Sequence, residues 1–495
     1  MQPSQPPPVD STSLALAGGL VASALAALVL ALAGCADTPS SPADSGGAGE
    51  RTAHRGGPPG GGGGGGWGGG GGMAGGPPGG GPGGPGGRGP AGRGGTELAE
   101  HTGPQVEPAG ARTVDNGRFV LEQGQAYLAN DPDLSAIYVR GRARVQLTAP
   151  QISKRGDSSA PLASSQRGLN AALLASDGSD VTVRGGRIDS NGASAAAVAA
   201  LGTGTRVWLG QLRVRTGGAH AHGVAVSAGG RAELLDADIT TTGPRAAALV
   251  ADRGGSTLLA TGGTLQTQGA GAPVLYSAGN LQLRKLRAHA DDGPAAVVDG
   301  GGAITLHDSA LAAGRQAGVL FQQAAEPGGA PAGRGYFAAQ GGSIAAADGP
   351  LFAVVGSQAT LVLEQVSLDA RSGLLLDARA GTVQVLATRQ ALRGRLSADA
   401  RSTLSLVLRN GSRLEGALAG ASLQLDASSR WQVTADSTLA VLQPPAAGTA
   451  PGTGIDSGGH TVRYDARLPG NAWLQGRSLP LAGGGQLVPG NEPGA

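Results

Sequence analysis

The sequence predicts an all-β fold, a right-handed parallel β-helix with three short strands per coil, which follows a disordered Gly/Pro-rich N-terminal segment. Between Ser179 and Gln323, three short aliphatic runs separated by Gly, Asp, Asn or Ser return with a period of roughly 20–26 residues. In runs such as Val181-Thr182-Val183 and Leu281-Gln282-Leu283, alternate side chains face inward and outward, as in a half-buried strand. A single unit cannot bury its apolar face, so the repeat predicts coils stacked into one solenoid.

Composition and charge limit the classes of protein and partner. The 495 residues include 92 Gly and 3% aromatic residues, and the net charge is +2. This near balance lacks the basic footprint of a nucleic-acid-binding protein and the polybasic patch that binds anionic lipid, so no nucleic-acid partner is expected. The single cysteine is Cys35, so no intramolecular disulfide can form and stability must come from stacking.

An apolar segment, residues 14–34, directly precedes Cys35. Its length would allow a transmembrane helix, but its N-terminal position and its end predict an export signal. The run Leu32-Ala33-Gly34-Cys35 resembles the lipobox of bacterial lipoproteins, in which small residues admit the signal peptidase and the cysteine thiol takes a diacylglycerol. The resemblance implies lipidation of Cys35 and attachment to a membrane through this N-terminal lipid.

Two further residue patterns bear on this signal. Residues 1–13 contain no Lys or Arg, where export signals carry positive charge, so a plain membrane anchor and a misplaced start codon stay open as alternatives. Ala36 stands where an Asp would imply retention of an enterobacterial lipoprotein in the inner membrane. The resemblance therefore implies a location at the outer membrane or cell surface.

The chain after this signal (residues 1–35) divides by composition into three parts. Residues 36–112 are dominated by Gly and Pro and cannot bury enough apolar area to offset chain entropy, so we expect a disordered tether. Residues 113–443 hold the β-helix, roughly a dozen coils, with a Pro/Gly loop at 324–335. Residues 444–495 are expected to form a C-terminal cap and tail that cover the last coil, since an uncovered edge would promote aggregation.

An exposed loop is predicted at residues 150–167, and it contains Arg155-Gly156-Asp157. Arg-Gly-Asp is the tripeptide that many integrins recognise, with its cation and carboxylate displayed on a tight turn. A chance occurrence in a chain rich in Gly and Arg is the alternative. Arg155, Gly156 and Asp157 are therefore the candidate ligand-binding residues.

The end of the repeat region resembles a known family. Residues 430–439, RWQVTADSTL, and the preceding Leu423-Gln424-Leu425 resemble the last rungs of pertactin-type autotransporter passenger domains. The block at residues 293–306 is similar to bacterial surface β-helix proteins. The resemblance covers about residues 113–443 and implies a surface protein of the adhesin type. The sequence ends at Ala495 without the translocator barrel of that family, so lipidation at Cys35 would replace the barrel as the anchor.

Parallel β-helices also include polysaccharide lyases and hydrolases, which need acidic residues clustered on one face. The nearest candidates in this sequence are Asp291, Asp292, Asp299, Asp308 and the pair Arg213 and Arg215. His220 and His222 could chelate a metal, but no third ligand is apparent, so an exposed polar pair at a turn is the preferred interpretation. Asn-Thr-Asp and Gly-His-Gly hydrolase signatures are absent. We therefore predict no catalytic residue, no metal site and no cofactor.

Three functions stay open at this stage. The first is a lipid-anchored surface protein that recognises a host, matrix or glycan ligand, and the second is a structural spacer without a specific ligand. The third is a polysaccharide lyase or hydrolase. Aromatic platforms would favour sugar binding, but Trp208 is the only Trp in the regular repeats and is expected to pack within the rungs.

Overall fold

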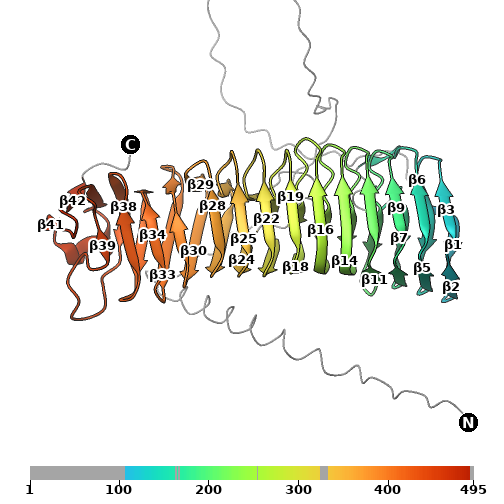
Figure 1. Cartoon of the computed structure of the whole chain (residues 1–495), viewed down its shortest axis with the longest axis horizontal. Coiled ribbons are helices and arrows are strands. Elements are labelled where there is room, and N and C mark those ends of the chain that lie inside the picture. Colours follow the sequence, from blue (N-terminus) through green and yellow to red (C-terminus); the bar gives the residue numbers. More distant parts are fainter. Residues whose placement is uncertain (1–105, 162–163, 165–167, 254, 324–332, 491–495) are drawn as a thin grey trace, which may run out of the picture. The chain divides into compact units, whose positions relative to one another are not determined.

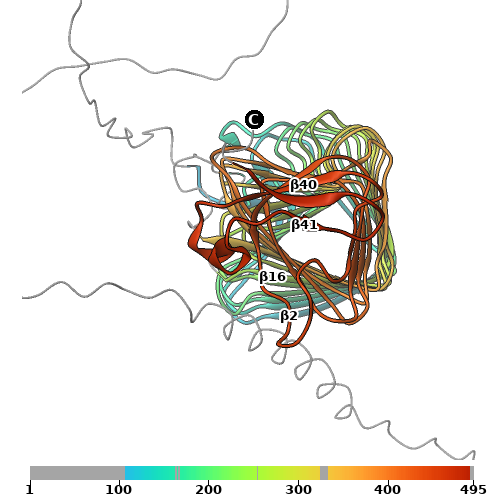
Figure 2. The ribbon, with the colours of Figure 1, turned by 90° about the vertical axis from the view of Figure 1, so that its left-hand side faces the viewer.

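The computed structural model describes residues 106–161, 164, 168–253, 255–323 and 333–490. From Ala109 onward the strands form a parallel β-solenoid of about 15 coils, and three strands make each regular coil (Figure 1). The predicted parallel β-helix is therefore confirmed. Seen along the stack, the strands of successive coils follow one another around a common interior (Figure 2).

One face of the coils up to β35 belongs to a 13-stranded parallel sheet, called sheet A. Its strands are β1 (Ala109–Val114), β4 (Leu134–Val139), β7 (Leu173–Ala175), β10 (Val198–Leu201), β13 (Val224–Ser227), β15 (Leu249–Ala251), β17 (Leu275–Ser277), β20 (Ala296–Asp299), β23 (Val319–Gln322), β26 (Phe352–Val355), β29 (Leu374–Arg379), β32 (Arg395–Ala398) and β35 (Leu418–Ala419).

The other two faces form sheet B, whose strands bend between a first and a second arm. The first arm contains β2 (Phe119–Gln123), β5 (Arg144–Thr148), β8 (Asp180–Arg184), β11 (Arg206–Gly210), β18 (Asn280–Arg284), β21 (Ala303–His307), β24 (Arg334–Gln340), β27 (Gln358–Glu364), β30 (Thr382–Thr388), β33 (Thr403–Arg409), β36 (Ala421–Leu425), β38 (Ser437–Leu442), β40 (Thr461–Asp465) and β42 (Gln486–Gly490).

The second arm contains β3 (Ala126–Ala129), β6 (Gln151–Lys154), β9 (Arg187–Ser190), β12 (Arg213–Thr216), β19 (Arg287–Ala290), β22 (Ala310–Ala313), β25 (Ser343–Ala346) and β28 (Ser367–Ala370). Two long strands, β14 (Arg231–Thr241) and β16 (Thr257–Thr267), run through both arms. A separate four-stranded sheet C continues this face with β31 (Ala391–Arg393), β34 (Arg413–Gly416), β37 (Arg430–Val433) and β39 (Ile455–Asp456).

A residue in the left-handed conformation turns the chain between the two arms, and this position is called the bend. Most L-residues avoid this conformation, and glycine adopts it without steric cost. The bend residues with positive φ include Gly124, Ala149, Gly185, Gln211, Asp236, Gly262, Lys285, Asp308, Gly341, Gln365 and Arg389. Because the same turn recurs in coil after coil, the residues that flank it stay in register along the stack.

Aliphatic side chains of successive coils stack inside the solenoid. Val181, Val207, Leu258 and Leu281 occupy one such column and are at most 2% exposed. Fully burying each side chain of this size contributes about 1.5–3 kcal/mol. The column exists because each strand alternates between inward aliphatic and outward polar residues, as the sequence predicts.

The turn from the second arm to sheet A has two ladders of small residues. Hydroxyl groups of Ser190, Thr216, Thr241 and Thr267 donate to the backbone carbonyl five residues further on. Glycines follow at Gly192, Gly218, Gly243 and Gly269. A Cβ on any of these glycines would lie 1.9–2.0 Å from the carbonyl oxygen of the glycine in the preceding coil. The close stacking of coils therefore requires glycine here.

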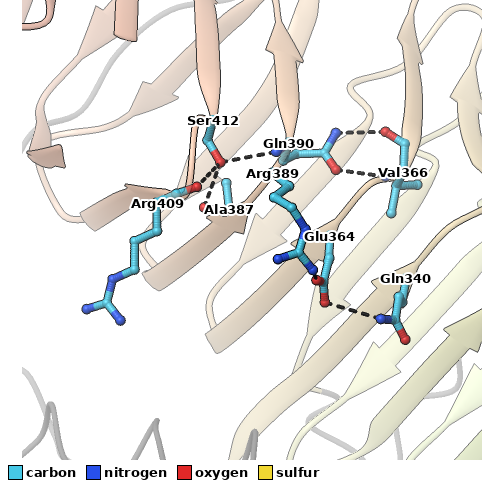
Figure 3. A network of polar contacts seen from close by, with 8 residues as sticks. All are labelled: Gln340, Glu364, Val366, Ala387, Arg389, Gln390, Arg409 and Ser412. Atoms are coloured by element: carbon cyan, nitrogen blue, oxygen red, sulfur yellow. Dashed lines mark hydrogen bonds and ion pairs between the residues drawn. The ribbon is translucent and has the colours of Figure 1, made fainter. Parts of the chain in front are cut away.

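Sheet C is not joined to β28 by backbone strand pairing, and a buried glutamine bridges the break. The side chain of Gln390 accepts a hydrogen bond from the Val366 N–H and donates to the Val366 carbonyl (Figure 3). The same amide nitrogen donates to the Ala391 carbonyl, and the Ser412 hydroxyl accepts from the Gln390 N–H. Gln390 thus supplies through its side chain the pairing that a ladder of strands supplies elsewhere.

Parallel pairing continues beyond residue 443. Strands β39, β40 and β42 each pair in parallel with an earlier strand, whereas β41 (Leu479–Pro480) pairs antiparallel with β42. A short 3₁₀ helix, η1 (Pro469–Leu474), lies between β40 and β41. Its Asn471 side chain accepts from the Leu442 N–H, and the Trp473 indole donates to the Leu442 carbonyl, which fixes the helix against the last coils.

The prediction of an exposed loop over residues 150–167 is wrong in part. Gln151–Lys154 is strand β6, with Ile152 and Lys154 buried. Beyond the loop, Ala171 packs with Leu174 and Ala199 on the outer face of sheet A. The sequence signal was misleading because β6 is short and ends in a lysine, which is rarely buried.

Candidate functional site

The structure places Arg155-Gly156-Asp157 directly after β6, against the neighbouring coil. Arg155 and Asp157 are exposed, and Gly156 adopts a φ of +82°. The Asp157 carboxylate accepts a hydrogen bond of 2.8 Å from the Ala193 N–H, and the Gly156 carbonyl accepts from Asn170. The carboxylate of the tripeptide is therefore engaged in holding the turn.

Buried Lys154 reinforces this turn. Its ammonium donates to the carbonyl oxygens of Asp131, Arg155 and Gly156, and the residue is fully buried. Burial lowers the pKa of Lys154 from its ordinary value, and the nearby carboxylates of Asp133 and others oppose that shift. The lysine thus fixes the backbone of the Arg-Gly-Asp segment from below.

A surface cavity lies elsewhere, next to the bend between β18 and β19. This cavity of about 450 Å³, called the Lys285 hollow, is lined by Gly263, Thr264, Lys285, Leu286, Arg287, Asp308, Ser309, Ala310 and Gly342. It exists because the coils on either side of Arg287 carry small residues at the matching positions. The register pairs Arg287 with Thr264 in the preceding coil and with Ala310 in the next.

Three exposed cations surround the hollow. Lys285 and Arg287 line it, and Arg284 is the adjacent outward residue at the end of β18. Within the described ranges, none of these three side chains forms an ion pair or a hydrogen bond. Cations without protein partners are available to bind an anionic ligand.

One carboxylate, that of Asp308, also lines the hollow. Its Oδ1 lies over Gly341, where an added Cβ would approach it to 2.5 Å. The carboxylate therefore leans toward the coil that follows, away from the coil of Lys285. With three cations and one acid, the rim of the hollow carries net positive charge.

Trp208 faces outward, which corrects the expectation that it packs within the rungs. Its neighbours Val207 and Leu209 point into the core, so the indole lies on the outer surface of the first arm, half-buried. The ring extends over Gly210, and the Arg184 guanidinium lies 4.7 Å from the ring centroid. This cation–π contact holds the Arg184 side chain in place.

The acidic residues considered for catalysis lie at different corners of the coil. Asp291 and Asp292 occupy the turn from β19 to β20, where they contact His289 and Arg315 respectively. Asp308 is at the bend, whereas Asp299 ends β20 in sheet A. The fold does not bring these four carboxylates together on one face.

Asp299 has its own polar environment and is fully buried. It accepts hydrogen bonds from the Tyr276 hydroxyl at 2.8 Å and from the Gln322 amide at 3.3 Å. Burial, together with the Asp299 carboxylate, raises the pKa of Tyr276. The tyrosine therefore stays protonated and serves as a hydrogen-bond donor.

His220 and His222 lie in the turn between β12 and β13. His220 is exposed and left-handed, whereas His222 is partly buried and its Nδ1 accepts a hydrogen bond from the Ala247 N–H. Burial, and then the neighbouring His220, lowers the pKa of His222 to about 4. Arg213 and Arg215 lie nearby on the outward face of β12.

No family model, no curated protein and no solved structure matches the chain. In the part of the chain that the structure describes, no group of three or more His, Cys, Asp or Glu could hold a metal ion. No helix among those residues has the length and apolarity needed to cross a membrane.

Sequence reasoning singled out Arg155–Asp157 and missed the Lys285 hollow. The signal for the hollow was present, since three cations occur within residues 284–287 of a chain that has only two lysines. What the sequence did not reveal was the small residues in neighbouring coils that open the space. Cys35 and most of the predicted tether at 36–112 lie outside the described residues, which begin at 106, and the last residues of that range belong to β1.

Proposed function

We propose that this protein is a bacterial surface recognition protein that binds an acidic glycan at the Lys285 hollow. The observation that supports the proposal is the set of three exposed, unpartnered cations, Arg284, Lys285 and Arg287, around a cavity of about 450 Å³. Carboxylate or sulfate groups of a glycan would form charge-assisted hydrogen bonds with them. The opening to solvent suits one part of a larger ligand.

The proposal includes an N-terminal lipid on Cys35. The lipobox-like sequence before Cys35 supports it, and the Gly-rich chain between Cys35 and the β-helix would keep the body clear of a membrane. Lipidation would place the protein at the outer membrane or cell surface. Mass spectrometry of the N-terminal peptide, with Cys35→Ser as the control, tests this part alone.

Glycan binding is tested on a surface array of acidic and neutral polysaccharides with the full chain. We expect retention on sulfated or uronate-containing polymers and none on neutral ones. A triple variant, Arg284→Gln with Lys285→Gln and Arg287→Gln, should lose retention. The matched control replaces three exposed arginines elsewhere, Arg144, Arg206 and Arg413, by Gln and should retain it, since the total charge change is the same.

Other results would favour other functions. A folded chain that binds neither polymer class would favour a structural spacer. Loss of polymer from the array, in place of retention, would favour a polysaccharide lyase or hydrolase. Equal retention of the triple variant and the wild type would show that the Lys285 hollow is not the glycan-binding site.

A further inference from the structure

Two arginines of the first arm lie in one line along the solenoid. Strand register connects them through three intermediate positions. In order these residues are Arg184, Gly210, Leu235, Thr261 and Arg284. Since neighbouring strands lie about 4.8 Å apart, the four steps separate the two arginines by about 19 Å. All five positions precede the bend directly. Arg184, Leu235, Thr261 and Arg284 are exposed, whereas the Trp208 ring covers Gly210.

No acidic residue interrupts this line, called the arginine column. Between the two arginines stand a glycine, a leucine and a threonine, and the column continues beyond Arg284 with His307 and Gln340. The nearest glutamate on the same arm, Glu233, is paired with Arg231 at 2.6 Å. The column positions between the two arginines therefore carry no carboxylate, and the exposed Asp236 lies beside them at the bend, with its Oδ1 over Gly262.

Trp208 holds Arg184 in a position where it can bind an acidic polymer. The guanidinium stacks on the indole and, within the described ranges, has no ion pair or side-chain hydrogen bond. A guanidinium that stacks on an aromatic ring uses its flat face for this contact. Its N–H groups, which lie in the guanidinium plane, remain available to bind a carboxylate or sulfate. Trp208 is therefore a positioning residue, because it acts through Arg184.

We propose that the ligand is a linear acidic polysaccharide that lies along the arginine column of the solenoid and bridges Arg184 and the cations at the Lys285 hollow. This inference rests on the proposed function and adds the length and direction of the ligand. An extended sugar chain advances along the stack by roughly one coil per sugar, so its acidic groups can follow the column.

The observations favour a polysaccharide over a nucleic acid or a small anion. Proteins that bind single-stranded nucleic acid offer aromatic faces on which bases stack, and Arg184 occupies the Trp208 face. The net charge of +2 gives no extended basic footprint. A small anion would use one end of the column and gain nothing from the other.

The test uses heparin-derived oligosaccharides from disaccharide to decasaccharide and measures their dissociation constants for the full chain. We expect weak binding of the shortest members at the hollow and a gain of at least about tenfold once an oligosaccharide spans both ends. Arg184→Gln should reduce that gain by about three- to tenfold without changing the affinity for the disaccharide. Trp208→Leu should lower the gain in the same way, and Trp208→Phe should restore part of it.

The outcomes separate this inference from the proposed function. The disaccharide could bind while affinity rises smoothly with oligosaccharide length and is unchanged by Arg184→Gln. That result would support a binding site at the Lys285 hollow and reject a ligand that bridges it to Arg184. If no oligosaccharide binds a folded chain, the proposed function fails first. Preferential binding of a single-stranded oligonucleotide of equal charge would replace the polysaccharide with a nucleic acid. Arg413→Gln is the matched control and should change none of these values.

Discussion

The side-chain amide of Gln390 forms two hydrogen bonds with the backbone of Val366, one to its N–H at 2.8 Å and one to its carbonyl at 2.7 Å. These bonds cross the one place where the second-arm face changes from sheet B to sheet C. A side chain therefore maintains the continuity of the solenoid where strand pairing stops.

Gln390→Leu should destabilise the protein by about 2–4 kcal/mol. The substitution leaves a buried N–H and at least one carbonyl without partners, and each unmade bond of this kind costs about 1–3 kcal/mol. Urea unfolding, with hydrogen exchange at Val366, measures the effect. Gln340→Leu, at an exposed position of the same network (Figure 3), is the control and should change stability by less than about 0.5 kcal/mol. Equal effects of the two variants would contradict the bridging role.

Gly218→Ala should destabilise the middle of the stack by about 1–3 kcal/mol or more. The new Cβ would lie 2.0 Å from the Gly192 carbonyl oxygen, so two coils must separate. Gly217→Ala is the matched control, because its Cβ would meet only side-chain atoms, Asn191 Oδ1 at 2.8 Å and Thr242 Oγ1 at 3.7 Å, and no backbone. Thermal unfolding of the two variants measures the difference. An unchanged melting temperature for Gly218→Ala would show that the coils are not so closely stacked.

His222 should make stability depend on pH below neutrality. Its pKa is about 4 in the folded protein and about 6.5 when unfolded, so the folded state binds fewer protons between these values. The contribution is complete above about pH 6.5 and is lost as the pH falls toward 4, by as much as about 3 kcal/mol. His222→Asn retains an acceptor for the Ala247 N–H and removes the titration. Urea midpoints of the variant should change less between pH 7 and pH 4.5 than those of the wild type, and parallel curves would refute this role.

Asp157→Ala should loosen the Arg-Gly-Asp turn. The carboxylate holds the Ala193 N–H, so its loss should speed hydrogen exchange at Ala193 and cost about 1 kcal/mol. Asp157→Asn keeps an acceptor and should protect this amide. Integrin-dependent cell attachment that is lost in both variants, without faster exchange at Ala193, would instead support recognition of the tripeptide.

The general fold could be predicted from the sequence because it depends on local patterns. Alternation in strands such as Val181–Val183 and the recurring glycines each report a coil without reference to distant residues. Sequence also indicated which side of each strand is buried, and the same alternation at Val207 and Leu209 could have shown that Trp208 faces outward.

The candidate site could not be predicted because it depends on register between coils. Coils differ in length, so the placement of Arg184 and Arg284 in one column follows only from the pairing of five strands. The buried Lys154 and Gln390 were missed for a related reason. Each satisfies backbone groups of another coil, and a polar residue with such partners looks like a surface residue in sequence.

The most direct test of the account is the affinity of the full chain for a heparin-derived octasaccharide at low and at high salt, measured beside the Arg284→Gln, Lys285→Gln, Arg287→Gln variant. The account predicts binding by the wild type that weakens as salt screens the charges, and a loss of roughly tenfold or more in the variant. Equal affinity of the two proteins, or wild-type binding that ignores salt, would contradict the claim that these cations form the ligand site.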